Sequence, residues 1–240
     1  MGDWDDWHSD IAGSTAAGQL VGRELGLPDG FPSNSLLPWA GIDGVSEALR
    51  LAPGSLVVDL ACGRGGYGLE VARRAAARLV GLDISTVAIR AARAAAGAEG
   101  FVVGDYTAAG LRDGCADAVM CVDAMQFADP TLAGLSECHR LLRPGGRIAL
   151  TCWEALDPDD ERQPERHRRM NLARDLAVAG FGQVQVTEKP DWRTAERSLW
   201  EAAAAADPDG DPGMASMREE AIRILTRFDG VRRVLAVAVA

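Results

Sequence analysis

Short apolar runs alternate with longer helical patterns from Leu56 onward. The runs that are candidates for buried strands cover residues 56–60, 79–82, 101–103, 118–122 and 148–152. Helical patterns lie between them, over residues 68–77, 86–96 and 130–142. Repeated strand, helix and strand is typical of a parallel sheet that carries helices on both faces. The sequence therefore predicts an α/β fold.

Further helix and strand candidates follow this pattern, and two additional regions flank it. A helical pattern over residues 164–179 follows the fifth run, and 184–186 and 231–239 are further strand candidates. The remaining regions contain most of the tryptophans and are predicted to be helical additions that can cap a pocket. The predicted division is an N-terminal helical cap segment over 1–50, a core over 51–189, a helical cap insertion over 190–229 and a last core strand over 230–240.

Charge limits the partners that this chain can bind. The formal net charge is −10 and the pI is about 4.8, so the surface repels phosphate backbones and anionic membranes. The densest basic stretch, 162–169, follows an acidic run, and we interpret it as a solvated helix face. A small-molecule partner is therefore expected, with no nucleic acid and no membrane, and the oligomeric state is left open.

Cysteine usage and the first residues favour a cytoplasmic protein. The five cysteines include no C-x-x-C pair, so neither a disulfide framework nor a metal site is indicated. The N-terminus is acidic and has no apolar signal-peptide region. Free thiols in apolar runs fit a reducing compartment.

The loop after the first strand candidate contains the sequence VVDLACGRGGYG. Gly63, Gly65 and Gly68 fit the G-x-G-x-x-G spacing of dinucleotide sites, so a nicotinamide or flavin cofactor has to be considered. The carboxylate of Asp59, at the strand tip, would however face a pyrophosphate. A zwitterionic amino acid with a sulfonium suits that position better. Asp83 follows the next strand and can accept both ribose hydroxyls of either cofactor.

Five segments in order carry a family resemblance: VVDLACGRGG, VGLDIS, VVGDYTAAGL, ADAVMCVDAMQFADP and RLLRPGGRIAL. With them the chain resembles the class I S-adenosylmethionine-dependent methyltransferases, and in particular bacterial small-molecule methyltransferases of secondary metabolism. The resemblance implies a Rossmann-like, seven-stranded, mostly parallel sheet with helices on both faces, an antiparallel last strand and helical caps. It also implies S-adenosyl-L-methionine as cofactor and S-adenosyl-L-homocysteine as product. Ala61 departs from the glycine that the family most often has.

The resemblance further implies which residues bind the cofactor. Asp59, Ala61 and Gly63 would contact its methionine end, and Gly65 belongs to the same loop. Asp83 would bind the ribose. Ile84, Asp105 and Tyr106 would bind the adenine. Cys121 would contact the methionine side through its carbonyl.

Methyl transfer needs an oriented acceptor, and some acceptors also need a base. The candidates for catalysis are His8, Asp123 and Gln126. His8 titrates near neutrality and is the first choice of base, although a surface histidine on an amphipathic helix is the simpler interpretation. Asp123 is either a base or a residue that orients its loop, and Gln126 can only form hydrogen bonds. We interpret His139 and His167 as structural.

Apolar side chains near the predicted strand tips and in the N-terminal segment are candidates for binding the substrate: Trp4, Trp7, Met125 and Trp153. Core packing explains the tryptophans equally well. Two alternative functions remain, an NAD(P)-dependent oxidoreductase and an S-adenosylmethionine-binding protein that catalyses a non-methylating reaction. The acceptor and its reacting atom are left open.

Overall fold

A computed structural model describes residues 4–5, 14–33, 35–96 and 100–240 of the chain. Trp7 and His8 lie outside the described residues. The strands form one seven-stranded sheet in the order β3-β2-β1-β4-β5-β7-β6. Their bounds are β1 Leu56–Leu60, β2 Arg78–Asp83, β3 Phe101–Val103, β4 Ala116–Val122, β5 Leu142–Ala155, β6 Gly182–Glu188 and β7 Val231–Val239.

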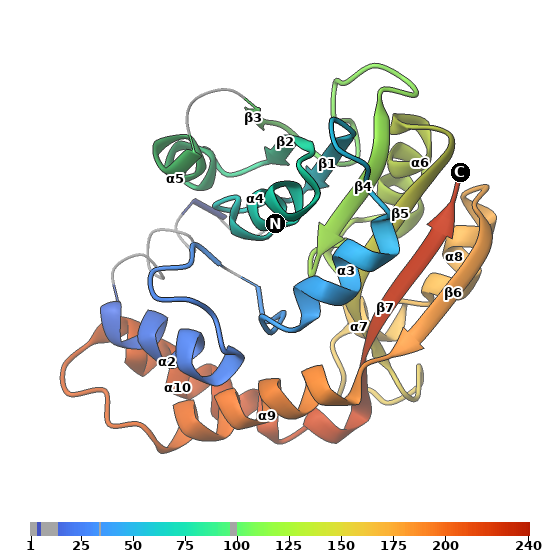
Figure 1. Ribbon diagram of the computed structural model, residues 1–240. Coiled ribbons are helices and arrows are strands. Elements are labelled where there is room, and N and C mark those ends of the chain that lie inside the picture. The colour runs from blue at the N-terminus through green and yellow to red at the C-terminus, as the bar shows by residue number, and fades with distance from the viewer. Residues whose placement is uncertain (1–3, 6–13, 34, 97–99) are drawn as a thin grey trace.

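The sheet is parallel except at β7. Strand β1 pairs in parallel with β2 and β4, β2 with β3, and β4 with β5. Strand β7 lies between β5 and β6 and is antiparallel to both, as Figure 1 shows by its reversed arrow. The predicted seven strands and the antiparallel last strand are thus confirmed. Strand β5 is longer than predicted, because pairing with β7 covers Arg147 to Ala155 and Leu142 pairs with Ala116 of β4.

Alternating residues divide the apolar core between the two faces of the sheet. On one face, Val57 and Met120 pack with helices α3 (Gly41–Leu49) and α4 (Gly66–Ala75). On the other face, Val58 and Cys121 pack with α6 (Thr131–Leu141) and α8 (Leu172–Val178). Burial on both faces explains why the central strands are apolar throughout.

The remaining helices are α2 Thr15–Leu25, α5 Thr86–Ala96, α7 Glu165–Arg168, α9 Pro190–Ala205 and α10 Pro212–Leu225, with short 3-10 helices η1 Met125–Phe127 and η2 Phe228–Gly230. Helix α6 has Pro130 as its N-cap residue. One expectation needs correction. The helix expected over 164–179 is two helices, because the Asn171 side chain accepts from the Arg174 amide and starts α8 anew.

Helices α2, α9 and α10 form a cap with an apolar core of its own, which includes Leu20, Leu199 and Met214. Ser14 caps α2 and donates 2.8 Å to Oδ2 of Asp211, which caps α10. The two regions predicted as caps therefore pack on each other. Helix α3, although within the N-terminal segment, lies against the sheet. The arrowhead of β4 points toward the cap in Figure 1. Among the described residues, no helix is long and apolar enough to cross a membrane.

Candidate active site

A cavity of about 270 Å³ lies where β1, β2, β3 and β4 end. Its polar lining includes five carboxylates: Asp59, Asp83, Asp105 and Asp123, each just inside or beyond the end of a strand, and Asp129. Trp4, Pro32, Val122 and Phe127 form much of its apolar lining. The cavity therefore occupies the carboxyl edge of the parallel strands, where ligands bind in sheets of this kind.

The loop from β1 to α4 is held open by left-handed backbone at Ala61, Gly63 and Gly65, with φ of 57°, 54° and 82°. This conformation costs an alanine about 1 kcal/mol relative to glycine, which explains why the family prefers glycine at position 61. Gly65 needs its glycine for another reason as well, because a Cβ there would lie 2.8 Å from the ring of Phe101. Gly65 does not line the cavity, and its expected contact with the cofactor stays a prediction.

Asp83 fixes this loop from the neighbouring strand. Its Oδ2 accepts from the Gly63 amide at 2.8 Å, and its Oδ1 accepts from the Ser85 amide at 2.9 Å. Ile84, beside it, lines the cavity with 38% of its surface exposed. An exposed isoleucine on a cavity wall is available to a flat apolar ligand, as predicted for the adenine.

Asp59 is buried beneath the same loop, and the pKa of its carboxyl is strongly raised. Burial and the nearby charge of Asp83 raise its pKa to about 8, although the Gly68 amide opposes the shift. Helix α4 approaches so closely that a Cβ on Gly68 would lie 2.5 Å from Oδ2 of Asp59. A buried carboxyl without a cationic partner is a site that a positively charged ligand stabilises.

The next two predicted residues lie on the opposite wall. Tyr106 lines the cavity, and its hydroxyl donates to the Ala124 carbonyl at 3.3 Å. Asp105 is exposed, and its Oδ1 accepts from the amide and hydroxyl of Thr107. The structure thus brings together Asp59, Ala61, Gly63, Asp83, Ile84, Asp105 and Tyr106 around one cavity.

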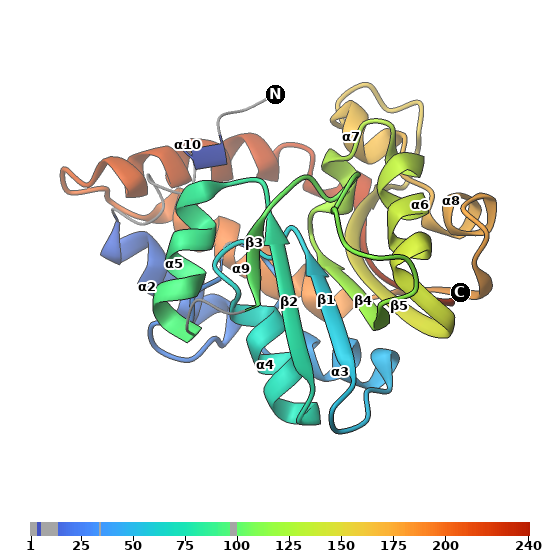
Figure 2. The same ribbon diagram turned by 90° about the horizontal axis from the view of Figure 1, so that it is seen from above.

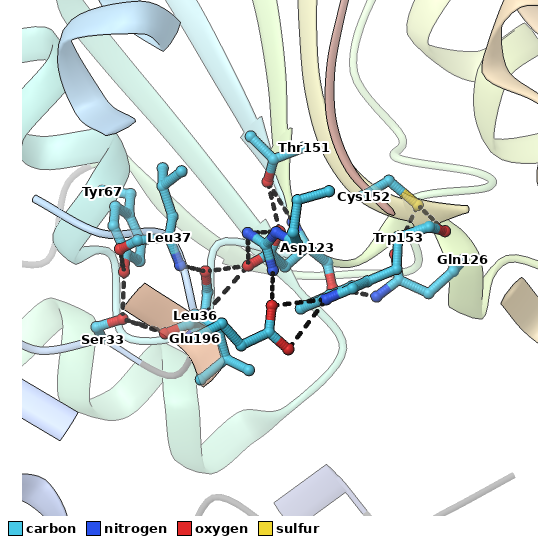
Figure 3. Close-up of polar contacts among 12 residues, drawn as sticks. Ser33, Leu36, Leu37, Tyr67, Asp123, Gln126, Thr151, Cys152, Trp153 and Glu196 are labelled. Atoms are coloured by element: carbon cyan, nitrogen blue, oxygen red, sulfur yellow. Dashed lines mark hydrogen bonds and ion pairs between the residues drawn. The ribbon is translucent and has the colours of Figure 1, made fainter. Parts of the chain in front are cut away.

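Asp123 follows β4 in left-handed backbone and forms the centre of a buried polar network (Figure 3). Its Oδ1 accepts from the Thr151 hydroxyl at 2.6 Å, and its Oδ2 accepts from the Ser35 hydroxyl at 2.8 Å and the Leu36 amide at 3.1 Å. Arg233, on β7, contributes an ion pair at 2.9 Å. With both oxygens engaged in this way, the carboxylate orients its loop and is not available as the base that the sequence left possible.

The network continues from Arg233 to the cap. The guanidinium lies 4.0 Å from the Trp153 ring centroid and 3.4 Å from Oε2 of Glu196, on α9. The indoles of Trp153 and Trp200 both donate to Glu196. Burial raises the pKa of Glu196, and the charge of Arg233 and the indole donors act against that shift. The cap helix is therefore joined to the cavity wall by buried charges.

Comparisons with known proteins agree with this geometry. Residues 58–150 match the family model described as a methyltransferase domain. This part of the chain is similar to class I S-adenosylmethionine-dependent methyltransferase domains. This finding confirms the family resemblance and the Rossmann-like fold class that the sequence motifs predicted.

Two curated relatives of this chain are C-methyltransferases according to their names. Sterol 24-C-methyltransferase of Aspergillus fumigatus is 32% identical over 151 residues, which are 60% of this chain and 40% of the relative. Botryococcene C-methyltransferase of Botryococcus braunii is 28% identical over 225 residues, 80% of this chain and 58% of the relative. The chain thus spans less than two thirds of the length of either relative.

Solved structures share the fold over nearly the whole chain. Geranyl diphosphate methyltransferase in complex with S-adenosylmethionine has a TM-score of 0.69 at 20% identity, with 97% of this chain and 94% of that chain covered. The [4+2]-cyclase SpnF has a TM-score of 0.72 at 20% identity, with 96% and 92% covered. Since a cyclase shares the fold, function has to be argued from the site.

Four other predicted site residues of the methyltransferase domain do not line the cavity. Cys121 and Met125 are fully buried in the core. Gln126 is 1% exposed and donates to the Asp123 carbonyl, and Trp153 packs between Arg233 and His167. All four lie near strand ends, but their side chains point into packed layers. The contact expected of the Cys121 carbonyl stays a prediction. Trp4 does line the cavity and meets Phe127 edge-on at 5.1 Å.

Three residues that shape the site were not predicted from the sequence. Ser35 and Tyr67 line the cavity, and Arg233 anchors Asp123. The position of Ser35 depends on how the N-terminal segment crosses the sheet, so no local pattern could reveal it. Arg233 had a signal, because a charged residue inside the apolar run 231–239 requires a buried partner.

Proposed function

We propose that this chain binds S-adenosyl-L-methionine in the cavity and is a methyltransferase for a small, largely apolar acceptor. The observation that carries the proposal is the set of carboxyl groups Asp59, Asp83 and Asp105 around the Gly63 loop in one cavity. These groups fit a ligand with an ammonium, a sulfonium and a ribose. They do not fit the pyrophosphate of NAD, which argues against the oxidoreductase.

The residues divide the cavity between cofactor and acceptor. Asp83 would hold the ribose, Ile84 the adenine face, and Asp59 with the Gly63 loop the charged amino acid end. The cofactor supplies a methyl group that its sulfonium already activates, and transfer leaves S-adenosyl-L-homocysteine. Phe127, Trp4 and Val122 exclude water from the acceptor side and favour an apolar body.

Proton removal is assigned to no described residue. Asp123 is held by Arg233, and burial raises the pKa of Tyr67 far above neutrality. His8 stays a prediction. Orientation of the acceptor on the Phe127 wall supplies rate enhancement without a base, because well-placed partners reach effective molarities of about 10⁵ M or more.

Calorimetry with the three candidate ligands tests the proposal. We expect S-adenosylmethionine and S-adenosylhomocysteine to bind and NAD(H) not to bind. Asp83→Ala should weaken both interactions by roughly tenfold or more, since hydrogen bonds to a charged group contribute about 1.5–3 kcal/mol. Asp113→Ala, which removes an exposed carboxylate, is the control. Binding of NAD(H) alone would refute the assignment.

A screen of apolar acceptors with labelled S-adenosylmethionine then tests transfer. Radiolabel in a product supports the methyltransferase. Tight cofactor binding with an unlabelled but altered acceptor would instead support a non-methylating reaction. A role in bacterial secondary metabolism is proposed on the sequence resemblance alone.

A further inference from the structure

Two arginines near the junction of α7 and α10 have no carboxylate in contact among the described residues. Arg166 lies on α7, and Arg227 follows α10. In the part of the chain that the structure describes, neither forms an ion pair, and neither does Arg168 of α7, whereas Arg162, Arg169 and Arg232 in the same region do. Glu220 is the carboxylate whose charge acts on Arg166 from a distance. In a protein with a formal charge of −10, two neighbouring cations without ion pairs call for an explanation.

Arg166 is placed directly over a wall of the cavity. Its guanidinium lies 5.4 Å from the centroid of the Phe127 ring, and Phe127 lines the cavity with 42% of its surface exposed. The basic stretch is therefore not a freely solvated helix face, as the sequence suggested. It forms a short helix that packs on the 3-10 helix of Phe127.

A buried glutamine brings Arg227 to the same place. Gln163 is 3% exposed, and its Nε2 donates 2.8 Å to the carbonyl of Arg227. This bond ties the end of α10 to the turn before α7, and Figure 2 shows both helices along the same side of the molecule. The charge of Arg227 acts on Arg166, so the fold holds two like charges near each other.

His167 completes the cluster without relieving this repulsion. Its ring stacks on Trp153 with centroids 6.0 Å apart, and its Nδ1 is buried without a hydrogen-bond partner. Burial and the charges of Arg166, Arg227 and Arg233 lower its pKa to about 3. The imidazole is therefore neutral at physiological pH, and the cluster keeps two fixed positive charges.

We propose that Arg166 and Arg227 bind an anionic oxygen group of the acceptor, a phosphate or a carboxylate, while its apolar body lies on Phe127. Guanidinium groups match both anions in geometry and form their strongest hydrogen bonds to them. An anion bound between the two arginines offsets the electrostatic repulsion between their positive charges. The inference rests on the proposed function for the acceptor, but the anion site itself does not require the cofactor.

Calorimetry with two simple anions tests the site in the full-length protein. Inorganic pyrophosphate and malonate are titrated separately, with S-adenosylhomocysteine present. We expect at least one anion to bind, and Arg166→Gln or Arg227→Gln to weaken that binding about tenfold or more. Arg223→Gln, which removes an exposed arginine of the same α10, should leave it unchanged. Preference for pyrophosphate assigns a phosphate, and preference for malonate assigns a carboxylate.

The outcomes separate this inference from the proposed function. Failure of the wild-type protein to bind either anion overturns the inference, as does an equal loss in Arg223→Gln. Affinity for S-adenosylhomocysteine is measured in every variant and should not change, which also shows that the variants fold. Anion binding without S-adenosylhomocysteine binding would refute the cofactor assignment and leave the anion site standing.

Discussion

Oδ1 of Asp123 lies 2.9 Å from a guanidinium nitrogen of Arg233, although 110 residues separate them in the chain. The pair joins the end of β4 to β7, with β5 between them in the sheet. Arg233 also contacts Glu196 of the cap. Since Asp123 lines the cavity, the shape of the acceptor wall depends on charges supplied by the last strand and by the cap.

Arg233→Met should destabilise the protein strongly. The substitution leaves Asp123 and Glu196 as buried carboxylates without their cation, and loss of one partner of a buried ion pair costs about 3–5 kcal/mol. Chemical denaturation measures the change in the free energy of unfolding. Arg223→Gln is the matched control, because its pair with Glu219 is exposed and should contribute less than about 1 kcal/mol. Equal effects would show that the buried network does not stabilise the fold.

Asp123→Asn should show whether Asp123 orients its loop or acts as the catalytic base. The amide keeps the shape of the side chain but loses the charge that faces Arg233, so we expect lower stability and a modest fall in kcat. The pH dependence of kcat should keep its form, because a residue that only orients the loop transfers no proton in the reaction. Loss of the acidic limb of the profile in a folded variant would restore Asp123 as the base, because a base must lose its own proton before it can act.

Local chemistry explains which parts of the molecule the sequence could predict. Asp59, Gly63 and Asp83 belong to a strand-loop-helix unit whose geometry follows from residues close together in the chain, and the structure places all three at the cavity. Met125, Gln126 and Trp153 do not line the cavity as expected, because proximity to a strand end does not determine which layer a side chain enters. Arg233 and Ser35 act on Asp123 through contacts between distant segments, which no local pattern contains.

Gly68→Ala should weaken cofactor binding. The new Cβ would lie 2.5 Å from Oδ2 and 3.1 Å from Cβ of Asp59, so either the buried carboxyl or the first turn of α4 must shift. Both belong to the loop proposed to hold the amino acid end of the cofactor. Titration calorimetry with S-adenosylhomocysteine should show at least a tenfold weaker affinity.

Gly18→Ala is the matched control for that substitution. Gly18 lies inside α2, and a Cβ there would meet nothing within 4 Å. We expect cofactor affinity to stay unchanged and the free energy of unfolding to rise by up to about 1 kcal/mol, the difference in helix propensity between the two residues. If both alanine variants bound the cofactor like wild type, close packing at Gly68 would not matter for the site.

The raised pKa of Asp59 predicts how the stability of the free protein depends on pH. Between about pH 4 and pH 8 the unfolded chain has lost this proton, while the folded protein, with a pKa of about 8, still holds it. The unfolded state then binds fewer protons, so this group lowers stability as pH rises through that window. Asp59→Asn should show a smaller decline than wild type in denaturation curves at pH 5 and pH 7.5.

Cofactor binding should release a proton from the same group. A cationic ligand beside Asp59 favours its ionised form, so the carboxyl that is mostly protonated at pH 7 in the free protein loses its proton in the complex. Affinity for S-adenosylmethionine should therefore rise between pH 6 and pH 8. Calorimetry at pH 7 in buffers with different ionisation enthalpies measures the released proton directly. Asp59→Asn should abolish the release, and an unchanged value in that variant would place the titrating group elsewhere in the cavity.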